Sequence, residues 1–531
     1  LEIVSIGLVI PVIQVLVLGK QDGLMTQLIM VLLPDVAEDN LGPWITGLFA
    51  TFFLLKNATL LVLIYMVNRI VAYNSAVYAR RAFNIYLARS IDFHFVNNSA
   101  TLLLNITTGV NRTLETLRLV LLMTLDAMLM IGACSLLIMA EPTATLSAAL
   151  VLIIVGAVFY GISSPIFRHW GEVSLTIERD LIKWINQSFN GIRDVKLLHA
   201  YRYLSQTIGY ITQRRAHYHC LSSTSIHIPR LLIETIVVIG FLGLVLVLLS
   251  KNQNPTDIVS TLGLFGMASL RLMPSMNRLL TSASEVRRSA AFINQIHEVF
   301  VPQAANSEGG DIGFDKTASL VFENHIALVN VTYSYPNAQY QALTKFNLEI
   351  KKGETVGFVG SSGAGKSTLM DIILGLLEPT SGSLLIDGKS AYDHTDGWQK
   401  HIGFVPQKIF ITDDTIRRNI AFAIDDEHID DHRISQVLTM TQLDSFVENL
   451  PDRLDTELGE HGTRLSGGQR QRIAIARSLY RDPDVMVFDE ATSALDNVTE
   501  HEITRAIETL AGDKTILIVA HRLSTVRKCD R

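Results

Sequence analysis

Charged residues are scarce in this chain of 531 residues. Asp, Glu, Lys and Arg make up 18% of the sequence and apolar residues 48%, whereas about a quarter of an average soluble protein is charged. The deficit lies in the first half, because the sequence after about residue 315 has an ordinary globular composition. We therefore expect part of the first half to lie in a membrane.

The sequence also lacks a cysteine framework and an excess of positive charge. Its three cysteines, Cys134, Cys220 and Cys529, are too scattered for a zinc motif or a set of disulfides, which favours ordinary thiols in a reducing compartment. The net charge is −6, so no nucleic-acid partner is expected. The length exceeds what one hydrophobic core usually supports and predicts two or more domains.

Long apolar runs dominate the first half of the chain. A spanning helix needs about 20 predominantly apolar residues. Six segments meet or approach this length, roughly residues 1–19, 44–72, 119–140, 142–167, 231–250 and 258–273. The fourth gives the strongest prediction because it contains no charge, whereas Glu2 and Pro11 leave a buried core helix as the alternative for the first. Residues 23–33 fit an interfacial helix better than a span.

The connections between these segments alternate in length and charge. Those near residues 141–143 and 251–256 are short, whereas residues 73–117 and 168–227 are long and helical in pattern. The two long connections contain Arg80, Arg81, Arg89, Arg112, Arg168, Arg179, Lys183, Arg193, Lys196, Arg202, Arg214 and Arg215, whereas the short sides have little beyond Lys20 and Lys251. The positive-inside rule therefore predicts that the long connections are cytoplasmic.

A few charges lie within or beside the predicted spans. Each costs about 2.5–3.5 kcal/mol at a bilayer centre, so such side chains should face water, protein or substrate. The set comprises Lys56, Arg69, Asp126, Arg230, Glu234 and Arg271. For Arg69 and Arg230, an interfacial arginine that extends toward water is an equally good interpretation from spacing alone. Arg271 precedes a proline that can kink its helix, which favours a cavity-lining role.

A phosphate-binding motif opens the second half. The stretch Gly360-Ser361-Ser362-Gly363-Ala364-Gly365-Lys366-Ser367-Thr368 fits G-x-x-x-x-G-K-[ST]. In this motif the backbone amides and the lysine hold phosphates, and the hydroxyl after the lysine ligates Mg²⁺. Residues 354–359 predict a short buried strand before the loop, and residues 369–377 a helix after it. The positive N-terminus of that helix would face the phosphates.

Further motifs follow in an alternating pattern of strands and helices, which is typical of an α/β domain. Leu465-Ser466-Gly467-Gly468-Gln469 opens a helix and would form a second anion site. The apolar strand 485–490 ends in Asp489 and Glu490, whose buried charges Mg²⁺ and a water molecule would satisfy.

Three single residues are ambiguous on their own. Gln407 follows a strand, and His521 follows the apolar strand 515–520, where a histidine is more often structural. Tyr335 precedes the phosphate loop by one hairpin; its ring could stack on an adenine or simply lie at a sheet edge.

Taken together, these motifs resemble the nucleotide-binding domain of the ATP-binding cassette (ABC) family. Seven elements match over roughly residues 325–530: Tyr335, the phosphate loop 360–368, Gln407, the signature 465–469, Asp489 with Glu490, the segment 493–496 and His521. The resemblance implies two such domains arranged head to tail, with each ATP between the phosphate loop of one and the signature of the other. This chain holds one copy of each, so we expect a second, most simply identical, half-transporter as partner.

The resemblance also implies a role for each matching residue. Lys366 and the loop amides hold the phosphates of ATP, and Ser367, Gln407 and Asp489 arrange Mg²⁺. Glu490 polarises the attacking water and His521 contacts the γ-phosphate. The partner's Ser466 and the partner's Gly468 complete the binding site around the ATP phosphates.

Six spans before one such domain resemble the exporter type of the ABC family, and within it most closely the bacterial lipid-linked oligosaccharide flippases. Three stretches carry this second resemblance: residues 64–69, residues 228–234 and residues 271–282. It implies that Arg69, Arg230 and Arg271 line a cavity and meet the pyrophosphate of a polyprenyl-linked glycan, which suits the bidentate guanidinium group.

The expected protein is an α-helical transmembrane domain at residues 1–300, a linker at 301–320 and an α/β P-loop ATPase domain of the ABC type at 321–531. Leu1 lies inside an apolar run, and Arg531 comes just after a motif that would be followed by more strand and helix in a complete domain, so we expect both ends to be truncated. The expected function is ATP-driven flipping of an amphiphilic cargo across a bacterial inner membrane, with the ATPase domain in the cytoplasm. Export of a peptide, another lipid or a drug is the alternative. Intact Glu490 and His521 argue against a cassette that regulates without pumping.

Overall fold

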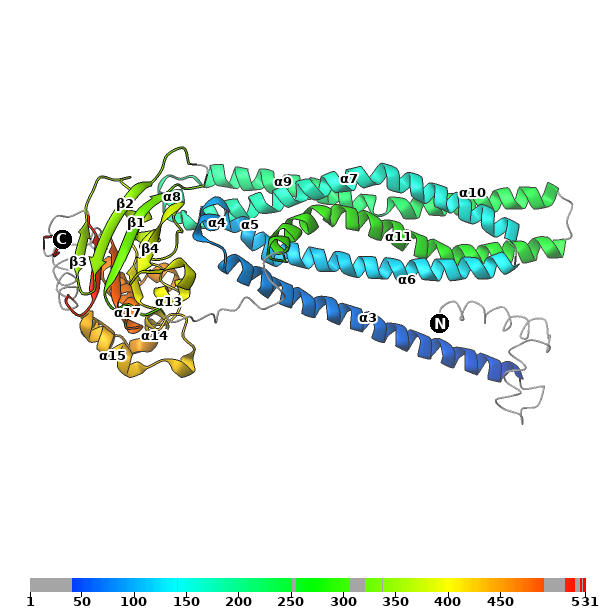
Figure 1. Ribbon diagram of the computed structural model, residues 1–531. Coiled ribbons are helices and arrows are strands. Elements are labelled where there is room, and N and C mark those ends of the chain that lie inside the picture. The colour runs from blue at the N-terminus through cyan, green and yellow to red at the C-terminus, as the bar shows by residue number, and fades with distance from the viewer. Residues whose placement is uncertain are drawn as a thin grey trace. The chain divides into compact units, whose positions relative to one another are not determined.

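The computed structural model describes residues 41–140, 142–250, 255–304, 320–336, 338–490, 511–520, 526–527 and 529–531 (Figure 1). The chain forms two compact units. Among the described residues, the first unit contains residues 41–88 and 97–304, and the second contains residues 89–96 and those from 320 onward. The second unit therefore includes a short segment from the helical half of the sequence.

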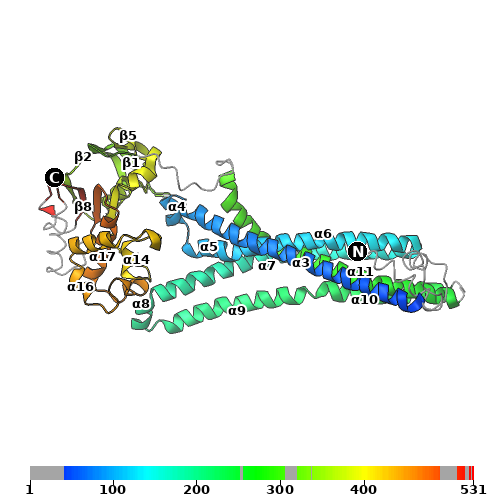
Figure 2. The ribbon, with the colours of Figure 1, turned by 90° about the horizontal axis from the view of Figure 1, so that it is seen from below.

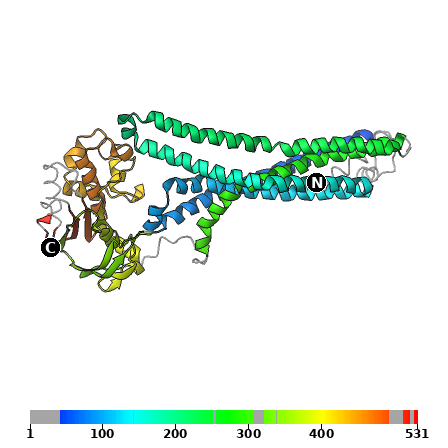
Figure 3. The same cartoon turned by 90° about the horizontal axis from the view of Figure 1, so that it is seen from above.

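The described part of the first unit consists of long helices and a few short ones. They are α3 (Leu41–Leu87), α5 (Ser99–Leu104), the π-helix η2 (Asn105–Gly109), α6 (Val110–Ala140), α7 (Pro142–Asn190), α8 (Ile192–Leu197), α9 (Tyr201–Ser225), α10 (Ile228–Ser250) and α11 (Pro255–Ala304). At about 1.5 Å per residue α3 is about 70 Å long, more than twice the roughly 30 Å of a bilayer core. The long cytoplasmic connections expected from the sequence are thus mostly continuations of the helices. Figures 2 and 3 show α6 beside α11 and α7 beside α9.

Three helical stretches of the described residues are long and apolar enough to cross a membrane. They are Ala50–Leu87, Ala149–Asn190 and Tyr201–Gly243, and they overlap the predicted spans 44–72, 142–167 and 231–250. Residues 119–140 lie in α6 and residues 258–273 in α11. The predicted span 1–19 and the predicted interfacial helix 23–33 lie outside the described residues.

The charged side chains that are buried within these helices contact protein groups. Lys56 is 6% exposed, and its Nζ lies 4.8 Å from the centre of the Phe53 ring. Asp126 on α6 is 8% exposed and accepts hydrogen bonds from Arg278 on α11. The Arg278 Nε lies 3.0 Å from both carboxylate oxygens, and Nη2 lies 2.6 Å from Oδ1. This bidentate ion pair ties α6 to α11 at a point where an isolated carboxylate would be costly.

Two sheets organise the second unit. The antiparallel sheet has the order β2 (Leu343–Lys351), β1 (His325–Tyr333), β4 (Ser381–Ile386), β5 (Lys389–Ser390), and the parallel sheet has the order β3 (Thr355–Phe358), β8 (Thr515–Val519), β7 (Val485–Asp489), β6 (Ile402–Val405). The helices are α4 (Ile91–Val96), α12 (Lys366–Ile373), α13 (Thr395–Gln399), α14 (Ile416–Ile420), α15 (Asp431–Met440), α16 (Asp444–Glu448) and α17 (Gly467–Tyr480). The predicted strand 354–359 and helix 369–377 are confirmed as β3 and α12, although the helix begins and ends earlier.

The parallel sheet is buried on both faces. Met486 and Ile516 pack into one hydrophobic cluster, with Ile473 of α17, whereas their neighbours Val487 and Leu517 pack into the other. All four strand residues are 0% exposed. Burial on both faces explains why β7 and β8 are continuous apolar runs without a polar alternation. It also fixes the edge of the sheet at which β3, β6 and β7 end.

The ion pair between the buried Asp126 and the exposed Arg278 provides a stability test. Asp126→Ala removes the carboxylate that Arg278 meets, and breaking a buried pair in this way costs about 3–5 kcal/mol when both partners are inaccessible. Because the Arg278 side chain is 55% exposed, we expect a smaller loss, on the order of 1–3 kcal/mol. It should appear as a lower midpoint of thermal unfolding for the detergent-solubilised protein.

A solvent-exposed pair of the same charge type is the control for this measurement. Arg168 and Glu172 lie 3.2 Å apart with side chains 67% and 53% exposed. Glu172→Ala should change the unfolding midpoint little, because exposed pairs contribute about 0–1 kcal/mol. Equal effects of the two substitutions would mean that the Asp126 pair is no more than a surface contact.

Candidate functional site

The carboxyl ends of three parallel strands form one edge of the sheet. The phosphate loop follows β3, Gln407 follows β6, and Asp489 is the last residue of β7 with Glu490 directly after it. Parallel strands end at the same edge, which is where open α/β sheets bind ligands. The structure brings two of the predicted residues into contact there, since Gln407 Nε2 donates a hydrogen bond to Glu490 Oε2.

The phosphate loop has a backbone that glycine alone satisfies. Gly365 has φ +87°, and a Cβ at this position would lie 2.6 Å from the carbonyl oxygen of Ala342. No side chain caps the start of α12, so its first amide groups remain available to an anion. Lys366 Nζ donates to the carbonyls of Gly360 at 2.7 Å and Ser361 at 3.0 Å. The lysine is therefore folded over the loop where ATP phosphates bind in this motif, and the loop fits ATP.

The oxygen donors at this edge fit Mg²⁺. Ser367 is exposed at the start of α12, Asp489 is the last residue of β7, and Gln407 follows β6. Among the described residues there is no cluster of three or more His, Cys, Asp or Glu side chains that could hold a metal on its own. A sparse set of oxygen donors is typical of Mg²⁺, which keeps several waters and binds substrate phosphates as well.

A further carboxylate, Asp371, lies near this edge and is not among the residues singled out from the sequence. Its burial, with the nearby charge of Asp489 as a second cause, raises the pKa of Asp371 from 3.8 to about 6. The spacing from Ser367 to Asp371 is i to i+4, which places both on one face of α12. That spacing is the only feature of the sequence that could have identified it.

Tyr335 lies beside the phosphate loop. Its hydroxyl and the Thr368 Oγ1 are 3.0 Å apart and hydrogen-bonded, and its side chain is half-buried. The ring of Tyr333 meets it edge-on, with ring centres 5.1 Å apart. An aromatic ring is thus held next to the loop that holds the phosphates.

The signature motif forms the start of α17, and this start is exposed to solvent although most of the helix is buried. Ser466 caps α17: its Oγ accepts from the Gln469 amide at 3.2 Å, and Gln469 Oε1 accepts from the Ser466 amide at 2.8 Å. This capping box fixes the helix start. Ser466 and Gly467 are exposed, and Gly468 is partly exposed. A positive helix end that is rigid and open is suited to an anion presented by another molecule.

Some predicted residues are not placed by the structure. His521, the segment 493–496 and the side chain of Arg271 lie outside the described residues. Arg69 on α3 and Arg230 on α10 are both exposed, and the Arg69 guanidinium carbon lies 5.5 Å from the centre of the Tyr73 ring. Glu234 is exposed one turn after Arg230.

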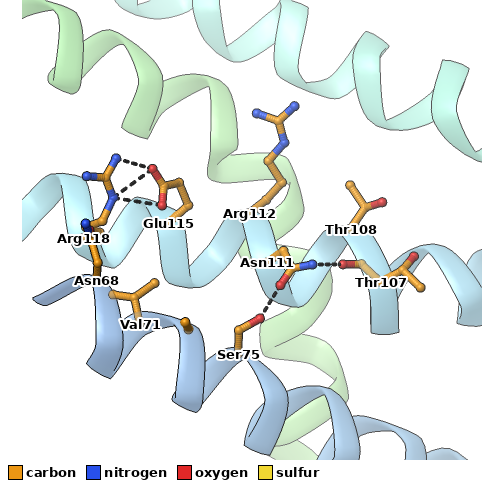
Figure 4. A pocket seen from close by; sticks show the side chains of 10 residues that line it. Asn68, Val71, Ser75, Thr107, Thr108, Asn111, Arg112, Glu115 and Arg118 are labelled. Carbon is orange, nitrogen blue, oxygen red and sulfur yellow. Dashed lines mark hydrogen bonds and ion pairs between the residues drawn. The ribbon is translucent and has the colours of Figure 1, made fainter. Parts of the chain in front are cut away.

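A polar groove of about 970 Å³ lies in the first unit (Figure 4). Its lining comes from α3, η2 and α6 and comprises Asn68, Val71, Ala72, Ser75, Thr107, Thr108, Asn111, Arg112, Glu115 and Arg118. Arg118 Nε donates to both oxygens of Glu115 at 2.9 Å, and Arg112 Nη1 lies 3.4 Å from Glu285 Oε1 on α11. Hydroxyls, amides and paired charges make this groove suitable for a polar group that carries many hydrogen-bonding atoms.

The groove was not predicted from the sequence. Asn68 directly precedes Arg69, a predicted cavity residue, and Thr107 and Asn111 are one helical turn apart, as are Thr108 and Arg112. Such spacing places polar side chains on one helix face. Only the packing of α3 against α6 makes these faces into one lining.

Comparisons with known proteins agree with these features. The sequence profile of the family described as ABC transporter matches residues 343–493. The chain is 30% identical over 443 residues to an ATP-dependent lipid A-core flippase of Ralstonia nicotianae, which covers 83% of this chain and 74% of that protein. It is 35% identical over 300 residues to the flippase of the same name from Shewanella frigidimarina, covering 56% of this chain and 49% of the relative. The chain thus spans about half to three quarters of the length of these curated relatives.

A solved structure gives a match over almost the whole chain. It is titled "Structure of a bacterial Atm1-family ABC exporter with ATP bound" and superposes with a TM-score of 0.78 over 99% of this chain and 89% of that one. The sequence identity is 23%, so this likeness concerns the fold. The predicted fold class, a helical transmembrane domain followed by an α/β ATPase domain, is confirmed.

The raised pKa of Asp371 predicts a pH-dependent stability. The folded state binds the Asp371 proton more tightly than the unfolded state, so its contribution to stability is present below about pH 4 and is lost as the pH rises through about 6. Asp371→Asn should therefore unfold at a higher temperature than the parent protein above pH 6, in the absence of nucleotide and Mg²⁺. The difference should disappear near pH 4, and the exposed Asp393→Asn should show none. A constant difference at all pH values would contradict this assignment.

Proposed function

We propose the following function for this chain, which belongs to the ABC transporter family as an exporter-type half-transporter. It flips a lipid-linked oligosaccharide or a similar polyprenyl-pyrophosphate glycan across a bacterial inner membrane. It is an integral membrane protein whose ATPase domain hydrolyses ATP to drive translocation of a lipid-like cargo. The partner that completes the transporter is a second copy of this chain.

One observation carries the cargo proposal: the first unit combines a polar groove with helices that expose apolar side chains. Leu54 and Leu61 on α3 are 72% and 69% exposed, whereas Asn68 on the same helix lines the groove. An amphiphile with a large polar head needs both kinds of surface. Relatives named as lipid flippases support a lipid anchor.

The pyrophosphate of this cargo would be met by arginines. Arg69 follows Asn68 in the chain, and Arg230 lies at the start of α10, so both are placed on helices of the first unit. Arg271 completes the proposed set. A guanidinium group binds two phosphate oxygens at once and stays charged, which suits recognition of a diphosphate.

We assign the steps of ATP hydrolysis to residues at the carboxyl edge of the parallel sheet. Lys366 and the loop amides hold the phosphates, and Ser367, Gln407 and Asp489 would hold Mg²⁺, which offsets phosphate charge when bound. Glu490 polarises the attacking water, and its hydrogen bond with Gln407 orients it. His521 contacts the γ-phosphate. The partner's Ser466 and the partner's Gly468 close the site, in agreement with the exposed start of α17.

Replacing Glu490, the proposed water-polarising residue, tests the mechanism of ATP hydrolysis. Glu490→Gln keeps the size and the hydrogen-bonding capacity of the side chain but removes its charge, so ATP should still bind. General-base catalysis contributes about 10²–10⁴-fold, so we expect ATP hydrolysis to fall by at least about 100-fold. ATP-bound dimers should accumulate and be detectable as nucleotide that co-elutes with the protein in size-exclusion chromatography.

The exposed Glu460 offers a matched control in the same domain, because its side chain is 83% exposed. Glu460→Gln should retain ATP hydrolysis. Normal turnover in the Glu490→Gln protein would exclude the assigned role of Glu490.

Reconstitution tests the cargo. The full-length transporter should be placed in liposomes that contain a fluorescent polyprenyl-pyrophosphate glycan, and exposure of the glycan on the outer face should be followed with ATP. We expect ATP-dependent movement that Glu490→Gln abolishes and that charge removal at Arg69 or Arg230 slows. Movement of a peptide or drug, with none of the glycan lipid, would reject the flippase proposal in favour of another cargo.

A further inference from the structure

Helix α4 folds with the ATPase domain although the chain before and after it belongs to the helical unit. Residues Arg89–Val96 are part of the second compact unit, while the chain up to Ala88 and from Asn97 belongs to the first. Ile91 of α4 packs against the hydrophobic cluster that contains Val331 and Leu369. The loop between two helices of the membrane domain is thus physically a part of the nucleotide-binding domain.

One hydrogen bond connects α4 to the end of β1. The Tyr333 hydroxyl donates to Asp92 Oδ1 at 2.5 Å, and Tyr333 is 2% exposed. Burial, together with this hydrogen bond, raises the pKa of Tyr333, so the hydroxyl remains a donor at every physiological pH. A buried hydroxyl that loses such a partner is strongly disfavoured, and the Tyr333 ring would have to move to recover one.

The Tyr333 ring in turn contacts Tyr335. Their ring planes are 88° apart with centres separated by 5.1 Å, a favourable edge-to-face geometry. Phe95 of α4 approaches Tyr335 from another side, with ring centres 6.1 Å apart and planes at 61°. The Tyr335 hydroxyl is hydrogen-bonded to Thr368 in α12. Tyr335 therefore lies between the phosphate loop and two rings, that of Phe95 in α4 and that of Tyr333, which is hydrogen-bonded to α4.

We propose that Asp92 is a positioning residue for nucleotide binding: through Tyr333, and together with Phe95, it holds Tyr335 at the orientation in which its ring stacks on the adenine. This inference rests on the proposed role of Tyr335 in binding the base. It gives a loop of the membrane domain a direct effect on ATP affinity, in addition to any effect on turnover.

The geometry predicts which kinetic constants for ATP hydrolysis should change when this contact is lost. Neither Asp92 nor Tyr333 is placed at the phosphates, so loss of their contact weakens base stacking but leaves Lys366, Glu490 and Gln407 unchanged. Stacking is made equally in the ground state and the transition state, so it lowers KM without raising kcat. Disturbing it should raise KM for ATP at constant kcat. It should also reduce the preference for ATP over GTP, because that preference depends on how the base sits on the ring.

The test measures ATP hydrolysis by the full-length transporter in detergent or nanodiscs. Asp92→Ala and Tyr333→Phe should each raise KM for ATP by about three- to tenfold, the range expected for one hydrogen-bond-scale contact, with kcat within about twofold of the parent. Asp92→Asn keeps an acceptor oxygen and should have a smaller effect. Val96→Ala, a change at an exposed position of the same helix, is the matched control and should leave KM unchanged.

Three outcomes separate this inference from the proposal on which it rests. Tyr335→Ala should raise KM more than Asp92→Ala; an unchanged KM would refute the role of Tyr335 itself. If Tyr335→Ala raises KM but Asp92→Ala and Tyr333→Phe do not, the positioning role of Asp92 is wrong. A fall confined to kcat would assign α4 to transmission of movement alone. Thermal unfolding of each variant checks that the protein is folded, and Tyr333→Phe retains the buried ring if Asp92→Ala is unstable.

Discussion

Burial of the parallel sheet on both faces is the constraint on which the ATP site depends. Strands β6, β7 and β8 have few alternatives to their present register, because side chains such as Met486 and Val487 face opposite hydrophobic clusters. Their carboxyl ends, with that of β3, therefore lie at one edge. The loop after β3, Gln407 and the pair Asp489 and Glu490 come from distant parts of the sequence and meet there for this reason.

Helix α4 links the two halves of the protein. A single linker between an ATPase domain and a membrane domain would transmit little force from one to the other. Here α4 is built into the ATPase core through Ile91 and Asp92, and the chain on both sides of it continues into the helical unit. The same contacts reach Tyr335, so a segment that connects the halves of the transporter also packs against the tyrosine proposed to stack on the adenine.

The sequence predicted the local structure around the phosphate loop better than the rest of the molecule. The phosphate loop, the strand before it and the helix after it follow from local requirements, such as the glycine at position 365 that no other residue can replace. Asp371 and Asp92 could not be recognised in the same way. Each is an ordinary acidic residue in sequence, and each acquires its importance from one neighbour, Asp489 or Tyr333, that is remote along the chain. The groove could not be recognised from the sequence either, because its polar helix faces form one lining only where α3 packs against α6.

By itself, the sequence determined the order of the two domains, the apolar character of the spans and the phosphate-binding motif. These properties depend on composition, on periodicity and on motifs in which a few adjacent residues suffice for the chemistry. Tertiary structure alone decided that Asp126 is paired with Arg278, that Gln407 meets Glu490 and that α4 belongs to the ATPase domain. The physical reason is that a buried charge or hydroxyl is satisfied by whichever partner the fold brings within about 3 Å, and sequence distance does not indicate that partner.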